Sequence, residues 1–117
     1  MPMKNILVLT DFSNNAYNAL FYAARLFKDI ECRVYLLNVF SEHTPLHSPN
    51  RVKGKSRNLL VQLEEEAREG LDMHFHRINL DAPNKKHIRK TIFRNGHLPD
   101  IVNEIVADRE IDLIVMG

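Results

Sequence analysis

The stretch Ile111-Asp112-Leu113-Ile114-Val115-Met116-Gly117 decides the fold class of this chain. Its apolar run, from Leu113 to Met116, is typical of a short strand buried on both faces of a parallel sheet. A glycine directly after such a strand indicates a tight turn into a helix, where the backbone often approaches a ligand. The sequence stops at this glycine, so we expect its 117 residues to be the front part of a larger domain.

Strand-like and helix-like segments alternate along the rest of the chain. Short apolar runs predict strands at residues 6–9, 33–40 and 113–116, and an alternating pattern predicts another at 90–95. Helical spacing of apolar residues predicts helices at about 14–29, from Ser56 toward Leu80, and from Pro99 onward, with a loop at 41–55 after the second strand. This alternation predicts one α/β domain over residues 1–117, an open parallel sheet with right-handed crossovers and helices on both faces. The strand at 90–95 is the least apolar, which suits a sheet edge.

Composition excludes several functional classes. The net charge of +1 favours neither nucleic acid nor an acidic membrane surface. No apolar run approaches the ~20 residues of a membrane helix. Cys32 is the only cysteine, so no internal disulfide can form and a cytoplasmic location is the default. We expect Cys32 to be a small buried residue beside a strand rather than a reactive thiol.

Candidate ligand contacts follow the strands, because open α/β sheets bind ligands beyond the carboxyl ends of their strands. The candidates include Thr10-Asp11, Val39, His97 and Met116-Gly117. The carboxylate of Asp11 could accept hydrogen bonds from a ribose or help to bind a metal, but it could also simply satisfy backbone amides of its own turn. Ser13 is expected to cap the helix that follows it, since no His-Asp partnership suggests a nucleophile.

Fingerprints of other sites are missing or weak. The sequence has neither G-x-G-x-x-G nor G-x-x-x-x-G-K-[ST], the two common phosphate-binding patterns. The pairs His74/His76 and His43/His47 lack cysteines or carboxylates at zinc spacing, so we expect surface histidines and no metal site. The basic cluster at residues 85–90 is expected to be a solvated turn.

Four segments in order resemble the universal stress protein (UspA-like) family. They are KNILVLTDFS at residues 4–13, Asn38-Val39, RNGHLPDIV at 94–102 and DLIVMG at 112–117. The resemblance covers about the first three quarters of the family's domain. It implies a Rossmann-like fold (adenine nucleotide alpha hydrolase-like) with the family's strand order 3-2-1-4-5, here 3-2-1-4 with the fifth strand missing.

The resemblance also implies a ligand, because many members of the family bind ATP while others do not. It places Asp11 and the backbone at Val39 against ribose and adenine, with Thr10 beside them. Met116 and Gly117 match the start of the phosphate stretch G-x2-G-x9-G-[ST], of which only the first glycine is present. We therefore expect ATP binding in the complete domain. Residues 1–117 alone are expected to bind ATP weakly or not at all, and millimolar or tighter binding by calorimetry would contradict this.

The expected function is that of a stress-response regulatory module, not an enzyme. The alternative is a structural or dimerisation module that binds no nucleotide. A nucleotidyltransferase-like enzyme ranks third, because residues 10–15 lack a His-x-Gly-His motif. The strand at 113–116 should leave an apolar edge, which we expect to pair with a second copy, with a swapped segment or with a missing C-terminal part.

Overall fold

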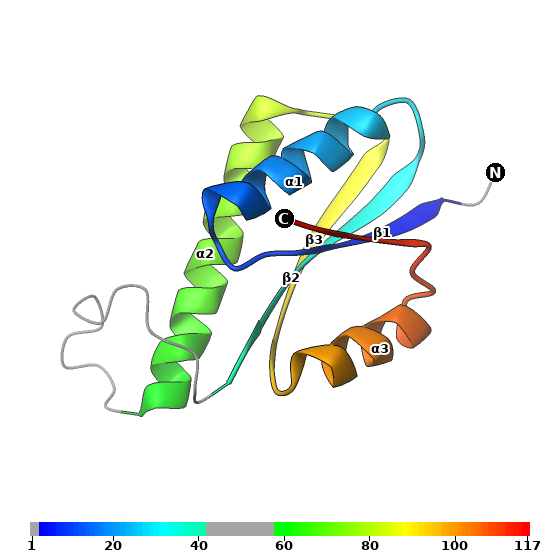
Figure 1. The fold of residues 1–117 in the computed structure, drawn as a ribbon. Coiled ribbons are helices and arrows are strands. Elements are labelled where there is room, and N and C mark those ends of the chain that lie inside the picture. The colour runs from blue at the N-terminus through cyan, green and yellow to red at the C-terminus, as the bar shows by residue number, and fades with distance from the viewer. Residues whose placement is uncertain (1–2, 42–57) are drawn as a thin grey trace.

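The computed structural model describes residues 3–41 and 58–117, in which four strands alternate with three helices (Figure 1). The strands are β1 (Lys4–Leu9), β2 (Cys32–Phe40), β3 (His87–Asn95) and β4 (Leu113–Met116). The helices are α1 (Asn14–Leu26), α2 (Leu59–Asp81) and α3 (Leu98–Asp108). The predicted loop, apart from Ser41, lies outside the described residues, together with His43, His47 and the predicted helix start at Ser56.

The four strands form one sheet in the order β3-β2-β1-β4. Every pairing in it is parallel. Helices α1 and α2 cover one face of the sheet and α3 covers the other (Figure 1). The predicted α/β fold class and strand order are therefore confirmed.

Two hydrophobic cores lie on opposite faces of the sheet, and β1 contributes to both. Successive side chains of a strand point to opposite faces. Ile6 and Val8 pack in the core beneath α1 and α2, whereas Leu7 packs in the core beneath α3. Cys32 is fully buried in the first core, as expected of a small apolar residue at the start of a strand.

Several element boundaries differ from the prediction. Helix α1 ends at Leu26 rather than near residue 29, and Pro99 is the second residue of α3 rather than the first. Strand β3 is an edge strand as predicted, but it begins at His87 rather than at Lys90. The buried ring of His87 explains the earlier start, because its Nε2 atom lies 2.7 Å from the Phe27 carbonyl oxygen and holds the strand against the end of α1.

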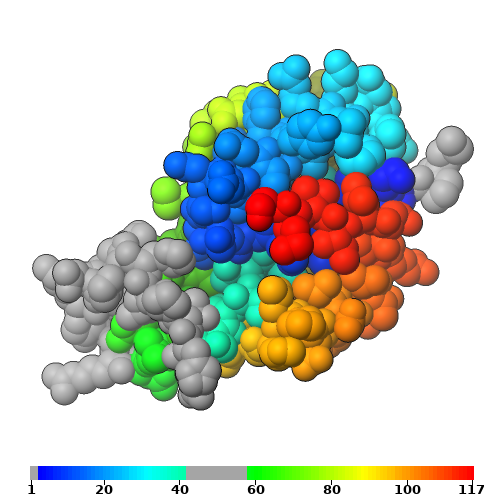
Figure 2. All heavy atoms as spheres, in the orientation of Figure 1, coloured from blue at the N-terminus to red at the C-terminus, as the bar shows by residue number. Residues whose placement is uncertain are grey.

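The prediction that β4 is buried on both faces is wrong in this structure. Strand β4 pairs with β1 on one side and forms the other edge of the sheet, as the predicted strand order requires, but its side chains are largely exposed. Ile114 is 43% exposed and Met116 is 64% exposed. Figure 2 shows β4, in red, at the surface between α1 and α3. Among the described helices, none is long and apolar enough to cross a membrane.

Candidate functional site

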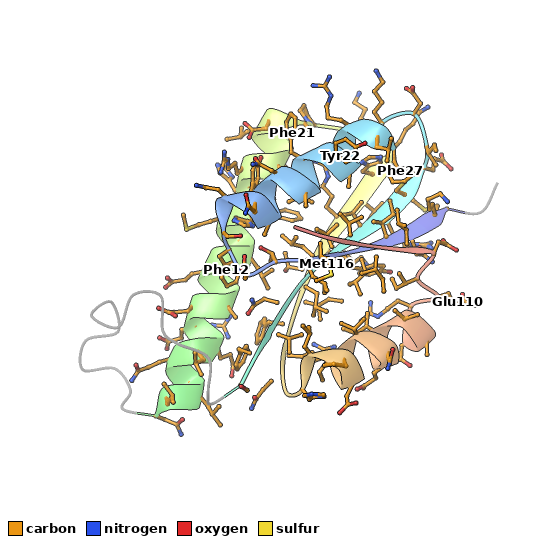
Figure 3. All side chains as sticks on the ribbon, viewed as in Figure 1. Phe12, Phe21, Tyr22, Phe27, Glu110 and Met116 are labelled. Carbon is orange, nitrogen blue, oxygen red and sulfur yellow. The ribbon has the colours of Figure 1, made fainter. Side chains whose placement is uncertain are left out.

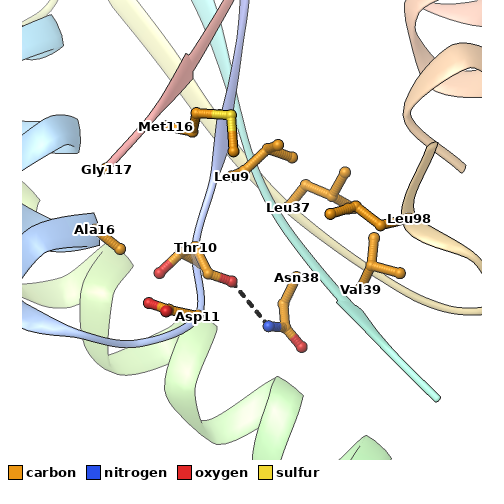
Figure 4. Close-up of a pocket in the computed structure, with 10 residues that line it drawn as sticks. All are labelled: Leu9, Thr10, Asp11, Ala16, Leu37, Asn38, Val39, Leu98, Met116 and Gly117. Atoms are coloured by element: carbon orange, nitrogen blue, oxygen red, sulfur yellow. Dashed lines mark hydrogen bonds between the residues drawn. The ribbon is translucent and has the colours of Figure 1, made fainter. Parts of the chain in front are cut away.

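A cavity of about 250 Å³ opens at the carboxyl ends of β1, β2 and β4. It lies where the strand order reverses, because the chain runs from β1 through β2 to β3 on one side of the sheet and returns to β4 on the other. The residues that line it are drawn in Figure 4: Leu9, Thr10, Asp11, Ala16, Leu37, Asn38, Val39, Leu98, Met116 and Gly117. The structure thus brings all five residues expected to bind a cofactor, Thr10, Asp11, Val39, Met116 and Gly117, to one cavity.

The loop between β1 and α1 forms one wall of the cavity. Asp11 accepts a hydrogen bond from the Ser13 backbone N–H through Oδ1 at 2.9 Å. Ser13 in turn caps α1, because its Oγ accepts from the Ala16 backbone N–H at 3.1 Å. The predicted cap is confirmed. Asp11 does satisfy an amide of its own turn, and it also lies at the cavity, so the two interpretations of its carboxylate are compatible.

Asn38 and Thr10 connect the ends of β2 and β1 at the floor of the cavity. Both residues are buried, and the Asn38 side-chain amide donates to the Thr10 carbonyl oxygen at 2.8 Å (Figure 4). The Thr10 backbone N–H donates to the Leu37 carbonyl oxygen at 2.9 Å. Sequence reasoning did not list Asn38 as a site residue, although its place at the carboxyl end of a strand was a signal for it.

A buried histidine of α2 contacts Thr10, one of the residues that line the cavity. His74, on α2, is 9% exposed, and its Nδ1 atom lies 3.3 Å from Oγ1 of Thr10. The expectation of a surface histidine is wrong for His74. The missed signal was helical spacing: Leu71, His74 and Ile78 lie on one buried face of α2.

The pKa of His74 reflects this environment. Burial lowers the pKa, the positive charge of Arg77 lowers it further, and the carboxylate of Asp11 opposes both. His74 is therefore neutral near pH 7, so its ring can accept a hydrogen bond from the hydroxyl of Thr10.

The end of β4 closes the cavity on the α1 side. A Cβ atom at Gly117 would lie 2.5 Å from the backbone oxygen of Asn15, so the backbone passes the first turn of α1 too closely for a side chain. The neighbour that requires a glycine here is the backbone of α1, whereas the turn into a helix and the approach to a ligand that this glycine indicated stay predictions.

Two other candidate sites receive less support. His97 is not among the cavity's lining residues; its exposed ring pairs with Asp100, with 3.3 Å between Nδ1 and Oδ2. Within residues 3–41 and 58–117, no three side chains of histidine, cysteine, aspartate or glutamate are grouped so that they could hold a metal ion.

Comparisons with known proteins agree with this architecture. The model of the universal stress protein family matches residues 2–117. Universal stress protein UspA from Lactobacillus plantarum is 26% identical, with a TM-score of 0.64 and a match covering 100% of this chain and 78% of that one. The hypothetical protein MJ0577 is 25% identical, with a TM-score of 0.70 over 97% of this chain and 73% of that one.

A universal stress protein solved in complex with cAMP is 12% identical, with a TM-score of 0.51 over 97% of this chain and 71% of that one, a likeness that shows the fold alone. No curated protein matches the chain significantly. The match of the family model over almost the whole sequence is decisive, and the chain belongs to the universal stress protein family.

Proposed function

We propose that this chain is a regulatory, non-catalytic module whose cavity binds the adenosine part of an adenine nucleotide. The observation that carries the proposal is the meeting of Thr10, Asp11, Val39, Met116 and Gly117 at one cavity beside the switch point between β1 and β4. Open α/β sheets bind ligands at this position. A cytoplasmic location belongs to the proposal, because the one cysteine of the sequence is a free thiol.

The backbone at Val39 offers a donor and an acceptor to a purine base. The Leu37 carbonyl accepts from Thr10, so the backbone groups of Leu37 face β1. Val39, two residues further along β2, has the same orientation, but the pairing with β1 has ended at Leu9. The N–H and C=O of Val39 therefore face the cavity instead of a neighbouring strand, and their spacing suits the edge of an adenine ring.

The carboxylate of Asp11 suits the ribose. A carboxylate accepts several hydrogen bonds at once, so ribose hydroxyls can share it with the Ser13 amide. The apolar side chains of Leu37, Leu98 and Met116 line the remaining wall and suit the faces of a base.

The size of the cavity limits what this part of the protein can hold. Its volume of about 250 Å³ is below the ~300–1,000 Å³ of ordinary small-molecule pockets. Phosphates are held by the backbone amides of Gly-rich turns and helix N-termini. Along the described part of the chain, Gly117 is the only glycine at the cavity. Binding energy is therefore expected from the base and the ribose alone. The family member solved with cAMP supports an adenine ligand by analogy of fold only.

A titration of the isotopically labelled chain with adenosine, AMP and ATP, followed by NMR, tests the proposal. We expect the backbone signals of Thr10, Asp11 and Val39 to shift. All three ligands should have similar dissociation constants, weaker than about 1 mM, because the phosphates gain no contact. Asp11→Asn should weaken binding, while Asp29→Asn, at the opposite end of the sheet, is the matched control. Signals that stay unmoved at the cavity, or move only elsewhere, would refute adenosine binding.

Self-association through β4 is a second candidate function. A surface that we call the β4 groove has a volume of about 370 Å³. It is lined by apolar residues of α1, of its C-cap Phe27 and of β4: Tyr22, Ala23, Leu26, Phe27, Leu113, Ile114, Val115 and Met116. It adjoins the unpaired edge of β4, and such edges template pairing with another chain.

Sedimentation over a range of concentrations tests this second candidate. If two copies pair along β4, Ile114→Lys should shift the population to monomer, whereas Glu104→Lys on the exposed surface of α3 should not. A native chain that stays monomeric at the highest concentration would exclude it.

A further inference from the structure

A buried polar contact attaches the loop that carries Asp11 to α2. Oγ1 of Thr10 lies 3.3 Å from Nδ1 of His74 on α2. The same Oγ1 accepts a hydrogen bond from the Phe12 backbone N–H at 3.0 Å. In the tautomer of His74 that carries its proton on Nε2, the Thr10 hydroxyl donates to Nδ1 while its oxygen accepts from the Phe12 N–H. This arrangement requires a neutral imidazole.

Phe12 adds a steric element to this attachment. Its φ of +69° lies in the left-handed region, which a bulky side chain rarely adopts. The ring of Phe12 points toward α2 (Figure 3) and meets the edge of the His74 ring with centroids 5.8 Å apart. A Cβ atom at Gly70 would lie 2.6 Å from the Phe12 ring. Gly70 and His74, one turn apart on α2, therefore form a notch that holds the unusual conformation of Phe12.

The electrostatic surroundings of His74 disfavour a charge on its ring. The ring also contacts Tyr17 of α1 edge-on, with centroids 5.4 Å apart, and the Tyr17 hydroxyl donates to Asp81 of α2. Arg77 of α2 lies over the Tyr17 ring, 3.7 Å from its centroid. Burial and Arg77 lower the pKa of His74, and Asp11 is the opposing negative charge.

We propose that His74 is a positioning residue for the cavity: when neutral it holds the β1–α1 loop with Asp11 at the cavity wall, and when protonated it releases the loop and weakens ligand binding. On protonation, Nδ1 changes from acceptor to donor toward Oγ1 of Thr10, so the hydrogen of the threonine hydroxyl loses its acceptor and must turn away. The notch must then accommodate a buried positive charge, which favours an opened loop. The part of the proposal that concerns ligand affinity rests on the proposed adenosine site, whereas the part that concerns the loop does not.

An NMR titration from pH 8 to pH 5 tests the loop directly. The amide signals of Thr10, Asp11 and Phe12 should shift together with the ring signals of His74. In His74→Asn, a side-chain oxygen replaces Nδ1 as the acceptor without titrating in this range, so the loop should stay in place and its signals should no longer follow the pH. His76→Asn is the matched control, because His76 is exposed on the same helix. The proposal would be overturned if the amide signals of the loop did not change with pH while the ring signals of His74 did.

Adenosine binding supplies the second readout, since adenosine carries no phosphate that titrates in this range. In the native chain its affinity should fall as the pH is lowered through the titration of His74, by about fivefold once His74 is fully protonated, as expected for the loss of one ordinary hydrogen bond. The affinity should stay level in His74→Asn. If the loop follows His74 but adenosine binds at no pH, the positioning role stands and the proposed function fails.

If His74→Asn does not fold, variants of Thr10 test the same contact from the other side. Thr10→Val removes the hydroxyl while leaving His74 in place, and it should displace the Phe12 amide signal at neutral pH. Thr10→Ser restores the hydroxyl and should restore the native signal and its dependence on pH. Equal spectra for Thr10→Val and the native chain at neutral pH would show that the contact positions nothing.

Discussion

Strands β1 and β4 have similar apolar sequences but differ in how much of each strand is buried. Ile6 to Leu9 reads Ile-Leu-Val-Leu, and β4 reads Leu-Ile-Val-Met. In β1, Leu7 and Val8 are completely buried, whereas in β4, Ile114 is 43% exposed. Strand β1 pairs on both sides and is covered on both faces, whereas β4 pairs with β1 alone. An apolar run therefore identifies a strand, but the neighbours of the strand decide how much of it is buried.

The largest expected effect is a difference in stability between the two strands. Leu7→Ala should lower the free energy of unfolding by about 2–5 kcal/mol, because it opens a cavity in a closed core. Ile114→Ala should cost about 1 kcal/mol or less, because the side chain is already half in water. Denaturant unfolding of both variants measures the difference. Equal losses would mean that β4 is covered in solution.

The second largest expected effect is a loss of stability at the carboxyl end of β1. The end of β1 is held by Asn38, whose buried amide donates to the Thr10 carbonyl oxygen at 2.8 Å. Asn38→Ala leaves that carbonyl without its buried partner and should cost about 1–3 kcal/mol. Asn18→Ala, on the exposed side of α1, is the control and should change little in the same denaturation experiment.

The core beneath α1 and α2 should also show a dependence on pH in the alkaline range. Burial, with the hydrogen bond to Asp81, raises the pKa of Tyr17 to about 12 from 10.0. The folded state favours the neutral phenol, so this contribution to stability is complete below pH 10.0 and is lost as the pH rises toward 12.

Replacement of the hydroxyl separates this effect from general alkaline unfolding. Tyr17→Phe should cost about 1 kcal/mol at neutral pH and abolish this part of the alkaline dependence. Tyr22→Phe, on an exposed ring of the same helix, should keep it. Unfolding curves at several alkaline pH values provide the measurement, and an unchanged slope in Tyr17→Phe would contradict the assignment.

The smallest expected effect lies at the end of β4. Met116 is 64% exposed, so Met116→Ala should change the free energy of unfolding by about 0.5 kcal/mol or less. The same side chain lines both the cavity and the β4 groove. If Met116→Ala lowered the free energy of unfolding more in concentrated than in dilute samples, a second copy of the chain would be covering the Met116 side chain.

The elements themselves could be predicted from the sequence because their signals are local. Apolar runs mark β1, β2 and β4, alternation marks part of β3, and the cap at Ser13 and helical spacing mark α1. The gathering of Thr10, Asp11 and Val39 at one edge followed from the rule that parallel strands end together. Boundaries such as the start of β3 were missed because they depend on a distant partner, the carbonyl of Phe27.

The sequence by itself determined the α/β alternation, the parallel sheet and the family's motifs at the strand ends. Only the tertiary structure decided that His74 is buried against Thr10 and how far the side chains of β4 are exposed. It also decided that Gly70, which local propensity alone would count as a weak point in α2, makes room for Phe12. The physical reason is the same in each case: local preferences act over a few residues, whereas burial depends on which distant segments pack against them.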